Sequence, residues 1–246
     1  MFRKLYLFYF LFFANYTISQ VSNPNFYRED QFYFSIYYNS IKNGVDELKE
    51  NKFSSSLNFG FIRDFPLNKS GKFSLGLGAG LGINSLNNNL RLNENILSFN
   101  ANTQNIQKNK YNYAEIQFPL EIRLRNSTID KYRFWRLYAG LKYSRILRSK
   151  FKFENSSQNY VQKTTPINQD QLGVSLNVGF NTWNLGIYKS VRPFFSDPDF
   201  PDFKLFKLGL VFYILWGFLN FSLFILVIWV KKELFSKNLL YLRHYR

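Results

Sequence analysis

The chain has 246 residues, of which 46% are hydrophobic and 20% aromatic, and its net charge is +16. It contains no cysteine and one histidine, His244, which excludes disulfide scaffolds, thiolate metal sites and cysteine nucleophiles and leaves little for imidazole chemistry. A mean hydropathy of −0.25 is too low for a bundle of membrane-spanning helices. A disordered chain would not carry 29 Phe and 17 Tyr.

The N-terminus has the features of a secretory signal peptide. Residues 3–4 are basic, residues 5–13 are uninterrupted apolar residues, and Thr17 and Ser19 are small residues at the spacing that a signal peptidase recognises. We therefore predict that residues 1–19 are a signal peptide and that the protein is exported. The alternative is an uncleaved anchor, but so short an apolar run spans only about half of a hydrocarbon core about 30 Å thick.

Residues 73–84 alternate strictly between apolar and small side chains. The small positions are Ser74, Gly76, Gly78, Gly80, Gly82 and Asn84. A period of two places every apolar side chain on one face of a strand. The glycine spacing does not match a nucleotide-binding loop, whereas small residues suit the crowded interior of a narrow barrel.

The same period recurs in eight segments. The segments are residues 32–39, 57–61, 73–84, 113–125, 135–144, 172–180, 183–187 and 208–214. Short links follow the second, fourth and sixth segments. The longer connections are residues 39–51, 87–110, 151–167 and 192–203.

An even number of strands with short turns at one end and long loops at the other is typical of an outer-membrane barrel. We predict an all-β fold, an eight-stranded antiparallel up-and-down transmembrane β-barrel over residues 31–215. Residues 20–30 then precede it in the periplasm, and both ends of the barrel chain lie on the periplasmic side. Residues 87–110 and 151–167 should be exposed outside the cell.

A membrane location is favoured because a tilted strand of about 9–11 residues crosses a bilayer and a closed barrel leaves no unpaired backbone in lipid. Aromatic side chains near the segment ends are expected to form interfacial girdles. They are Tyr33, Tyr37, Tyr38, Tyr111, Tyr113, Phe134, Trp135, Trp183, Tyr188, Phe212 and Tyr213. The alternative is a soluble, lipocalin-like barrel with its apolar side chains inside.

Four stretches resemble a PorT-like, porin-like family of outer-membrane barrels of Bacteroidota. They are YREDQFY at 27–33, GFIRDFPLNK at 60–69, FPLEIR at 118–123 and FWRLYAG at 134–140. The resemblance runs from Tyr27 to about Leu215. It implies a role as an accessory of type IX protein secretion or envelope assembly, with secretion-system components as partners. A small passive structural or ligand-binding barrel is the alternative.

The C-terminal region allows two interpretations. Residues 207–214 resemble the signal that barrel-assembly machinery recognises during insertion, which makes that machinery an expected partner. Residues 208–230 carry no charge and precede two lysines, as in a transmembrane helix. If the barrel ends at Leu215, the remaining apolar stretch measures only about 22 Å as a helix. We therefore predict that residues 216–246 form an apolar, helical and then basic read-through extension, with a second anchor as the alternative.

In the fourth and fifth segments, charged residues occupy the face opposite the apolar one, which predicts an ionic cluster inside the barrel. Its members are Glu115, Glu121, Arg123, Arg136 and Lys142. Inward residues have odd numbers on the first of these strands and even numbers on the second. The numbers of two facing residues must therefore add to an odd number, because a one-residue slip would turn a strand inside out. A sum of 257 places Glu121 opposite Arg136, whereas 259 places Arg123 there. We predict the register with a sum of 257, since opposite charges that face each other across strands stabilise a sheet by roughly 0.2–1 kcal/mol. The alternative is that the long side chains reach other partners and the turn sets the register.

Catalytic, cofactor and metal sites are not expected. Asp197, Asp199 and Asp202 are close in sequence, but their proline-interrupted spacing is that of a turn and not of a calcium loop. We expect no enzyme activity, no cofactor, no nucleic-acid partner and no wide pore, because eight-stranded barrels are filled by their own side chains. The excess positive charge indicates anion selectivity, contact with outer-membrane lipid phosphates, or simply a solvated loop surface.

Overall fold

The computed structural model describes residues 28–42, 48–50, 52–93, 96–99, 106–126, 134–163, 165–196 and 201–215. Within them the regular elements are strands: β1 (Gln31–Lys42), β2 (Ser55–Pro66), β3 (Phe73–Asn87), β4 (Leu90–Asn93), β5 (Ile96–Phe99), β6 (Ile106–Arg125), β7 (Trp135–Asn155), β8 (Asn159–Gln162), β9 (Asp170–Phe180), β10 (Trp183–Ser190) and β11 (Lys204–Leu215). Among these residues there is no helix of the length and hydropathy needed to cross a membrane. The predicted signal peptide and C-terminal extension lie outside the described residues.

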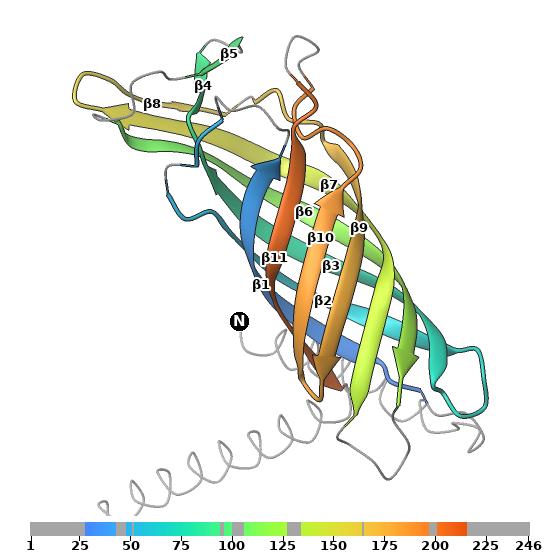
Figure 1. Ribbon diagram of the computed structural model, residues 1–246. Helices are drawn as coiled ribbons and strands as arrows, with labels where there is room; N and C mark the ends of the chain where they lie inside the picture. The colour runs from blue at the N-terminus through green and yellow to red at the C-terminus, as the bar shows by residue number, and fades with distance from the viewer. Residues whose placement is uncertain are drawn as a thin grey trace, which may run out of the picture.

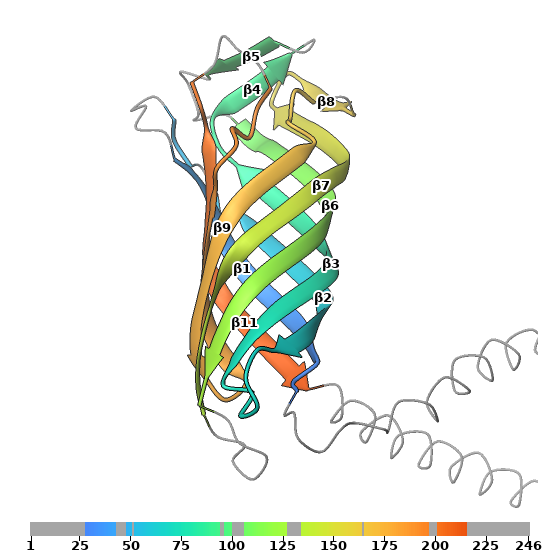
Figure 2. The same cartoon turned by 90° about the vertical axis from the view of Figure 1, so that its right-hand side faces the viewer.

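Eight strands close into an antiparallel barrel, which confirms the predicted fold class (Figures 1 and 2). The order around the barrel is β1, β2, β3, β6, β7, β9, β10 and β11. β11 returns to β1, with pairs from Gln31↔Leu215 to Lys42↔Lys204, so the ring has no free edge. Each of the eight predicted segments lies within one of these strands.

The three short connections gather at one end of the barrel, here called the short-turn end, where β1 also begins and β11 ends (Figure 1). The β9–β10 hairpin turns on Asn181 and Thr182, and Asn181 adopts a φ of 57°. This left-handed conformation is one that asparagine tolerates better than most residues. The opposite end, with the longer connections, is called the long-loop end.

The long-loop end is more ordered than the sequence predicted. β6 and β7 have 20 and 21 residues and project beyond the neighbouring strands, with β8 pairing to the tip of β7 (Figure 1). Residues 87–110 and 151–167, which the sequence predicted as long loops, therefore contain β4, β5, β8 and the outer parts of β6 and β7. The alternation continues there with reversed polarity, because Tyr111 and Phe151 point inward and Lys110 and Lys152 point outward. A search for apolar outward residues misses such a strand.

The two faces of the barrel wall differ in polarity. Outward side chains are apolar and exposed, as at Phe59 (55%) and Leu81 (58%), whereas inward ones such as Asn58 and Gln117 are polar and 2% exposed or less. This is the distribution expected for a wall in contact with lipid. The alternative of a soluble, lipocalin-like barrel is wrong, because it requires the opposite distribution.

The predicted aromatic girdle is confirmed only in part. Trp135 and Trp183 point outward at the short-turn end and are 65% and 62% exposed. Several predicted members instead point inward and are buried: Tyr33, Tyr37, Tyr111, Tyr113, Tyr188 and Tyr213. On each strand they are separated from the polar inward residues by an even number of positions and so lie on the same face. The barrel interior therefore contains phenol rings as well as charges.

The glycines of β3 line the interior, as predicted, and make room for large neighbours. A Cβ atom at Gly76 would lie 2.6 Å from Nε of Arg123. A side chain at this position would force Arg123 to move, because Arg123 crosses the space that a larger residue would fill. The bare face of β3 therefore positions the charged side chains of β6.

Candidate functional site

The interior of the barrel is the candidate site, because it holds the buried charges of the molecule. All five predicted cluster residues lie there and are at most 9% exposed. The structure divides them into two groups. Glu121, Arg123 and Arg136 belong to a cluster near the short-turn end, and Glu115 and Lys142 belong to a cluster farther along the lumen.

The predicted β6–β7 register is wrong. The paired positions add to 261, so that Glu121 lies opposite Gly140 and Arg123 opposite Tyr138, and neither 257 nor 259 occurs. From Glu115 to Arg125 on β6, the residue numbers of each facing pair do add to an odd number, as predicted. Arg125 and Arg136 are even placed directly opposite each other.

Two like charges can face each other here because their side chains reach different partners. The Arg125 guanidinium contacts Asp64 on β2 at 2.6 Å, while the Arg136 guanidinium lies 4.5 Å from the ring centroid of Phe134. The alternative expectation, in which long side chains find partners away from the facing strand, describes the structure. Pair energies of about 1 kcal/mol or less are easily outweighed by such contacts.

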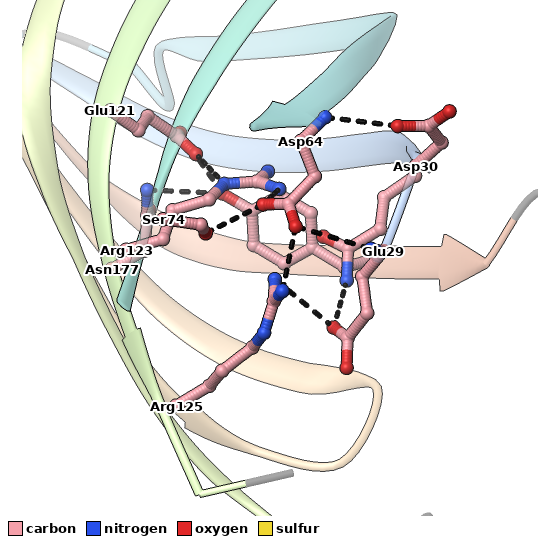
Figure 3. A network of polar contacts seen from close by, with 10 residues as sticks. Glu29, Asp30, Asp64, Ser74, Glu121, Arg123, Arg125 and Asn177 are labelled. Atoms are coloured by element: carbon pink, nitrogen blue, oxygen red, sulfur yellow. Dashed lines mark hydrogen bonds and ion pairs between the residues drawn. The ribbon is translucent and has the colours of Figure 1, made fainter. Parts of the chain in front are cut away.

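Asp64 is the centre of the short-turn cluster (Figure 3). Its carboxylate contacts Arg123 at 3.3 Å and Arg125 at 2.6 Å, and it accepts a hydrogen bond from Ser74 Oγ at 2.7 Å. The backbone N–H of Glu29 also donates to it, at 3.1 Å. A fully buried carboxylate with this many donors is compensated for its loss of hydration.

Arg123 links Asp64 to a second carboxylate. Its Nε donates to Glu121 Oε2 at 3.0 Å, and its guanidinium carbon lies 4.6 Å from the ring centroid of Tyr138. Glu121 also accepts a hydrogen bond from the Tyr213 hydroxyl at 3.2 Å. The cluster therefore connects β2, β6, β7 and β11 across the lumen.

The chain entering β1 contributes to the closure of the short-turn end. Glu29, in the segment predicted to precede the barrel, is 1% exposed and lies 3.7 Å from Arg125. The side chain of Gln31 donates to Glu29 at 2.9 Å, and Asp30 accepts from the backbone N–H of Asp64 at 3.0 Å. Three members of this cluster, Glu29, Asp64 and Arg125, were absent from the predicted set.

The central cluster is built around Glu115. Its carboxylate accepts hydrogen bonds from Asn84 at 3.2 Å, Gln117 at 2.7 Å and Ser144 at 2.9 Å, and contacts Lys207 at 3.4 Å. Lys207, on β11, also donates to Asn84 at 2.8 Å. The sequence prediction missed Lys207, although it shares the inward parity of Gly209 and Tyr213.

Lys142 has an aromatic environment. Its ammonium nitrogen lies 4.6 Å from the ring centroid of Tyr188 and 5.7 Å from that of Tyr37, and it forms no ion pair within the described part of the chain. It lines an internal cavity of about 20 Å³ together with Tyr37 and Glu121. A cavity of this size has room for about one water molecule.

The long-loop end is filled by an apolar plug. Its fully buried members include Leu86, Leu90, Leu92, Tyr111, Phe151, Phe153, Phe194 and Phe203. The Phe194 N–H donates to the Phe203 carbonyl at 2.7 Å, and Asn168 donates to the Phe195 carbonyl at 3.0 Å. Ionic clusters, a cavity for about one water and this plug follow one another along the lumen, which leaves no open channel through the described residues.

The arrangement is suited to holding strands together. In the part of the chain that the structure describes, no three His, Asp or Glu side chains gather as a metal site requires. Asp64, Glu115 and Glu121 each contact a buried cation. Asp202 is described, whereas Asp197, Asp199 and His244 lie outside the described residues.

The chain is similar to one protein family and to several solved structures. The sequence profile of the family described as "Outer membrane protein beta-barrel domain" matches residues 18–225. A solved structure of Ail, the attachment invasion locus protein of Yersinia pestis, is similar at 14% identity and a TM-score of 0.37, over 76% of this chain and 97% of that chain. A second Ail structure, in complex with the heparin analogue sucrose octasulfate, is similar at 12% identity and a TM-score of 0.38, with the same coverage.

A comparison with curated proteins found no significant match. The family profile covers most of the chain, including all eight strands of the closed barrel. The chain therefore belongs to the outer membrane protein beta-barrel domain family, and its location is the outer membrane.

Proposed function

We propose that the protein is a non-conducting barrel that serves as an accessory of type IX protein secretion or envelope assembly. The observation that carries the proposal is the filled lumen, with ionic clusters on one side and an apolar plug on the other. A barrel without a channel acts through its surfaces. The projecting ends of β6 and β7 provide a rigid surface of this kind at the long-loop end (Figure 1).

The assignment to secretion rests on the resemblance to PorT-like barrels. Two of the resembling stretches, residues 60–69 and 118–123, contain Asp64, Glu121 and Arg123 of the short-turn cluster. The motifs that carry the resemblance thus include residues that hold this barrel together. Secretion-system components are the partners that the proposal implies, and barrel-assembly machinery is the partner during insertion.

The proposal assigns no enzymatic activity to the barrel. Hydrolysis requires a nucleophile or a metal beside a general base. The buried carboxylates described above are instead held by cations and amide donors. Neither a cofactor nor a nucleic acid is required by the proposed role.

Gene deletion combined with affinity purification tests the accessory role. Deletion should block export of the secreted proteins, and the purified full-length protein should carry secretion or assembly components with it. A matched control is the deletion strain that carries a plasmid copy of the wild-type gene, in which export should be restored. Normal secretion in the deletion strain and no co-purifying component would contradict the role.

A passive structural or ligand-binding barrel is the second candidate. It is favoured by the concentration of lysines on the outer face of β6 and β7, which suits an anionic ligand without any need for secretion partners. The deletion strain separates the two candidates, since a passive barrel predicts unchanged secretion.

A further inference from the structure

A band of basic side chains covers the outer face of the β6–β7 projection and the end of β8. Its members, here called the basic ribbon, are Lys108, Lys110, Arg148, Lys150, Lys152 and Lys163. Among the described residues, Glu154 is the acidic partner of this set, at 2.6 Å from Lys108 and 4.0 Å from Lys152. The hydrogen bond from Lys108 holds the pKa of Glu154 below its usual range, so this carboxylate stays ionised. It offsets one positive charge, and the other cations of the set leave the ribbon strongly positive.

The strand register brings these cations close together. Lys110 pairs directly with Lys152, and the next outward pairs are Asn112 with Lys150 and Ala114 with Arg148. Like charges at directly opposite positions are destabilising in a two-stranded pairing. An anion between them would relieve this repulsion, and a phosphate group has the charge and the oxygens for this role.

The inner face of the projection is fixed, so the cations are held on a rigid surface. Tyr111 and Phe151 pack with ring centroids 4.7 Å apart, and both belong to the apolar plug. On β8, the Tyr160 hydroxyl donates to the Leu92 carbonyl at 2.8 Å, and Arg91 lies 4.4 Å from the ring centroid of Phe153. The basic ribbon therefore loses less conformational entropy on binding than lysines on a free loop would.

The position of the ribbon matches the head-group layer of the membrane. The outer face of β7 is apolar as far as Leu141 and then carries Arg145, which pairs with Asp170 at 2.9 Å. The run of cations begins at Arg148, next to Leu147 and at the irregularity in the β6–β7 pairing. From Arg148 to Lys152 a strand advances about 13 Å, which is about 9–10 Å along the membrane normal at a tilt near 45°. The head-group region on each side of a bilayer is about 5–8 Å thick. Since long loops face the exterior in such barrels, this is the outer leaflet.

We propose that the basic ribbon binds the phosphate groups of anionic lipids in the outer leaflet of the outer membrane. The proposal goes beyond the accessory role and holds whether or not the protein takes part in secretion. Bound lipid would be held on the β6–β7 side of the barrel. It would also offset the repulsion between Lys110 and Lys152.

Binding of lipid A to the purified, folded full-length protein in non-ionic detergent tests the proposal. The probes are bis-phosphorylated lipid A and its enzymatically dephosphorylated form. The test variant combines Lys110→Gln, Lys150→Gln and Lys152→Gln. The control variant combines Lys69→Gln, Lys72→Gln and Lys189→Gln, which removes the same charge from exposed lysines elsewhere on the barrel.

The ribbon variant should bind phosphorylated lipid A at least about tenfold more weakly than the wild type, and the control variant should lose less than about twofold. Dephosphorylated lipid A should bind the wild type as weakly as phosphorylated lipid A binds the ribbon variant. Equal losses in both variants, or equal binding of the two lipids, would overturn the proposal. Ribbon-dependent binding of dextran sulfate with no preference for lipid phosphate would overturn it in favour of a polysaccharide.

A folding check accompanies the binding assay. Each variant is examined for its heat-dependent shift in gel mobility, and a second ribbon variant with arginine at the same three positions should retain lipid A binding. Should the triple glutamine variant fail to fold, the single variants Lys110→Gln and Lys152→Gln are compared with Lys69→Gln, and equal losses of binding in all three would overturn the proposal.

Discussion

At the residue scale, the interior charges find their partners across the lumen and along strands. Glu121 contacts Arg123 two residues away on the same strand, and Arg123 continues to Asp64 on β2. Removing one member of a buried pair leaves an uncompensated charge, which costs about 3–5 kcal/mol. These residues therefore act together in stabilising the barrel, and their substitutions should not be additive.

A double-mutant cycle tests this coupling. Glu121→Gln and Arg123→Gln should each lower the free energy of unfolding in urea, and together they should lower it by less than the sum, with a coupling of about 0.5–3 kcal/mol. The matched control pairs Glu121→Gln with Lys207→Gln, whose contacts are in the central cluster. Its effects should add to within about 0.5 kcal/mol. Additivity in the first cycle would show that the Glu121–Arg123 contact contributes nothing.

The glycine strand gives a second prediction at this scale. Gly76→Val should push Arg123 away from its carboxylates and destabilise the barrel by about 1–3 kcal/mol, because the added atoms have no free space. Ala139→Val, on the outward face of β7, adds bulk on the lipid side and should have little effect. Urea unfolding followed by tryptophan fluorescence measures both, and equal stability of the two variants would contradict the packing described for Gly76.

At the element scale, the strands that the sequence predicted best are those with lipid on one side and polar contacts on the other. β3, β9 and β11 follow this rule over almost their whole length. The outer parts of β6 and β7 were missed because there the apolar face turns inward onto the plug and lysines face outward. The predicted β6–β7 register was wrong, because the register depends on where long side chains such as Arg125 reach and not on the charge of the facing residue.

The ordered projection changes the expected pattern of surface proteolysis. Trypsin added to intact cells should cut after Lys163, which follows β8, well before it cuts after Lys110 or Lys152 within paired strands. A Tyr111→Ala/Phe151→Ala variant, which loses the ring contact that supports the projection, should be cut at all three sites at similar rates. Mass spectrometry of the fragments identifies the sites, and cleavage only after cell lysis would contradict the orientation of the barrel.

At the scale of the whole molecule, the barrel is closed by the pairing of β1 with β11, which ends at Leu215. Truncation after Leu215 should therefore leave folding and membrane insertion intact. The heat-dependent shift in gel mobility of the protein in outer-membrane fractions measures both. A truncated chain that fails to assemble while the full-length chain assembles would show that residues 216–246 are needed for the fold.

The filled lumen is the central claim about the molecule, and single-channel recording in planar lipid bilayers tests it most directly. The cavity of about 20 Å³ and the buried plug predict that the reconstituted full-length protein gives no stable ion conductance. A Phe194→Ala/Phe203→Ala variant removes two side chains of the plug. Its recordings show what conductance looks like when the plug is incomplete. Regular, discrete conductance steps from the wild-type protein, absent from protein-free bilayers, would contradict a closed lumen.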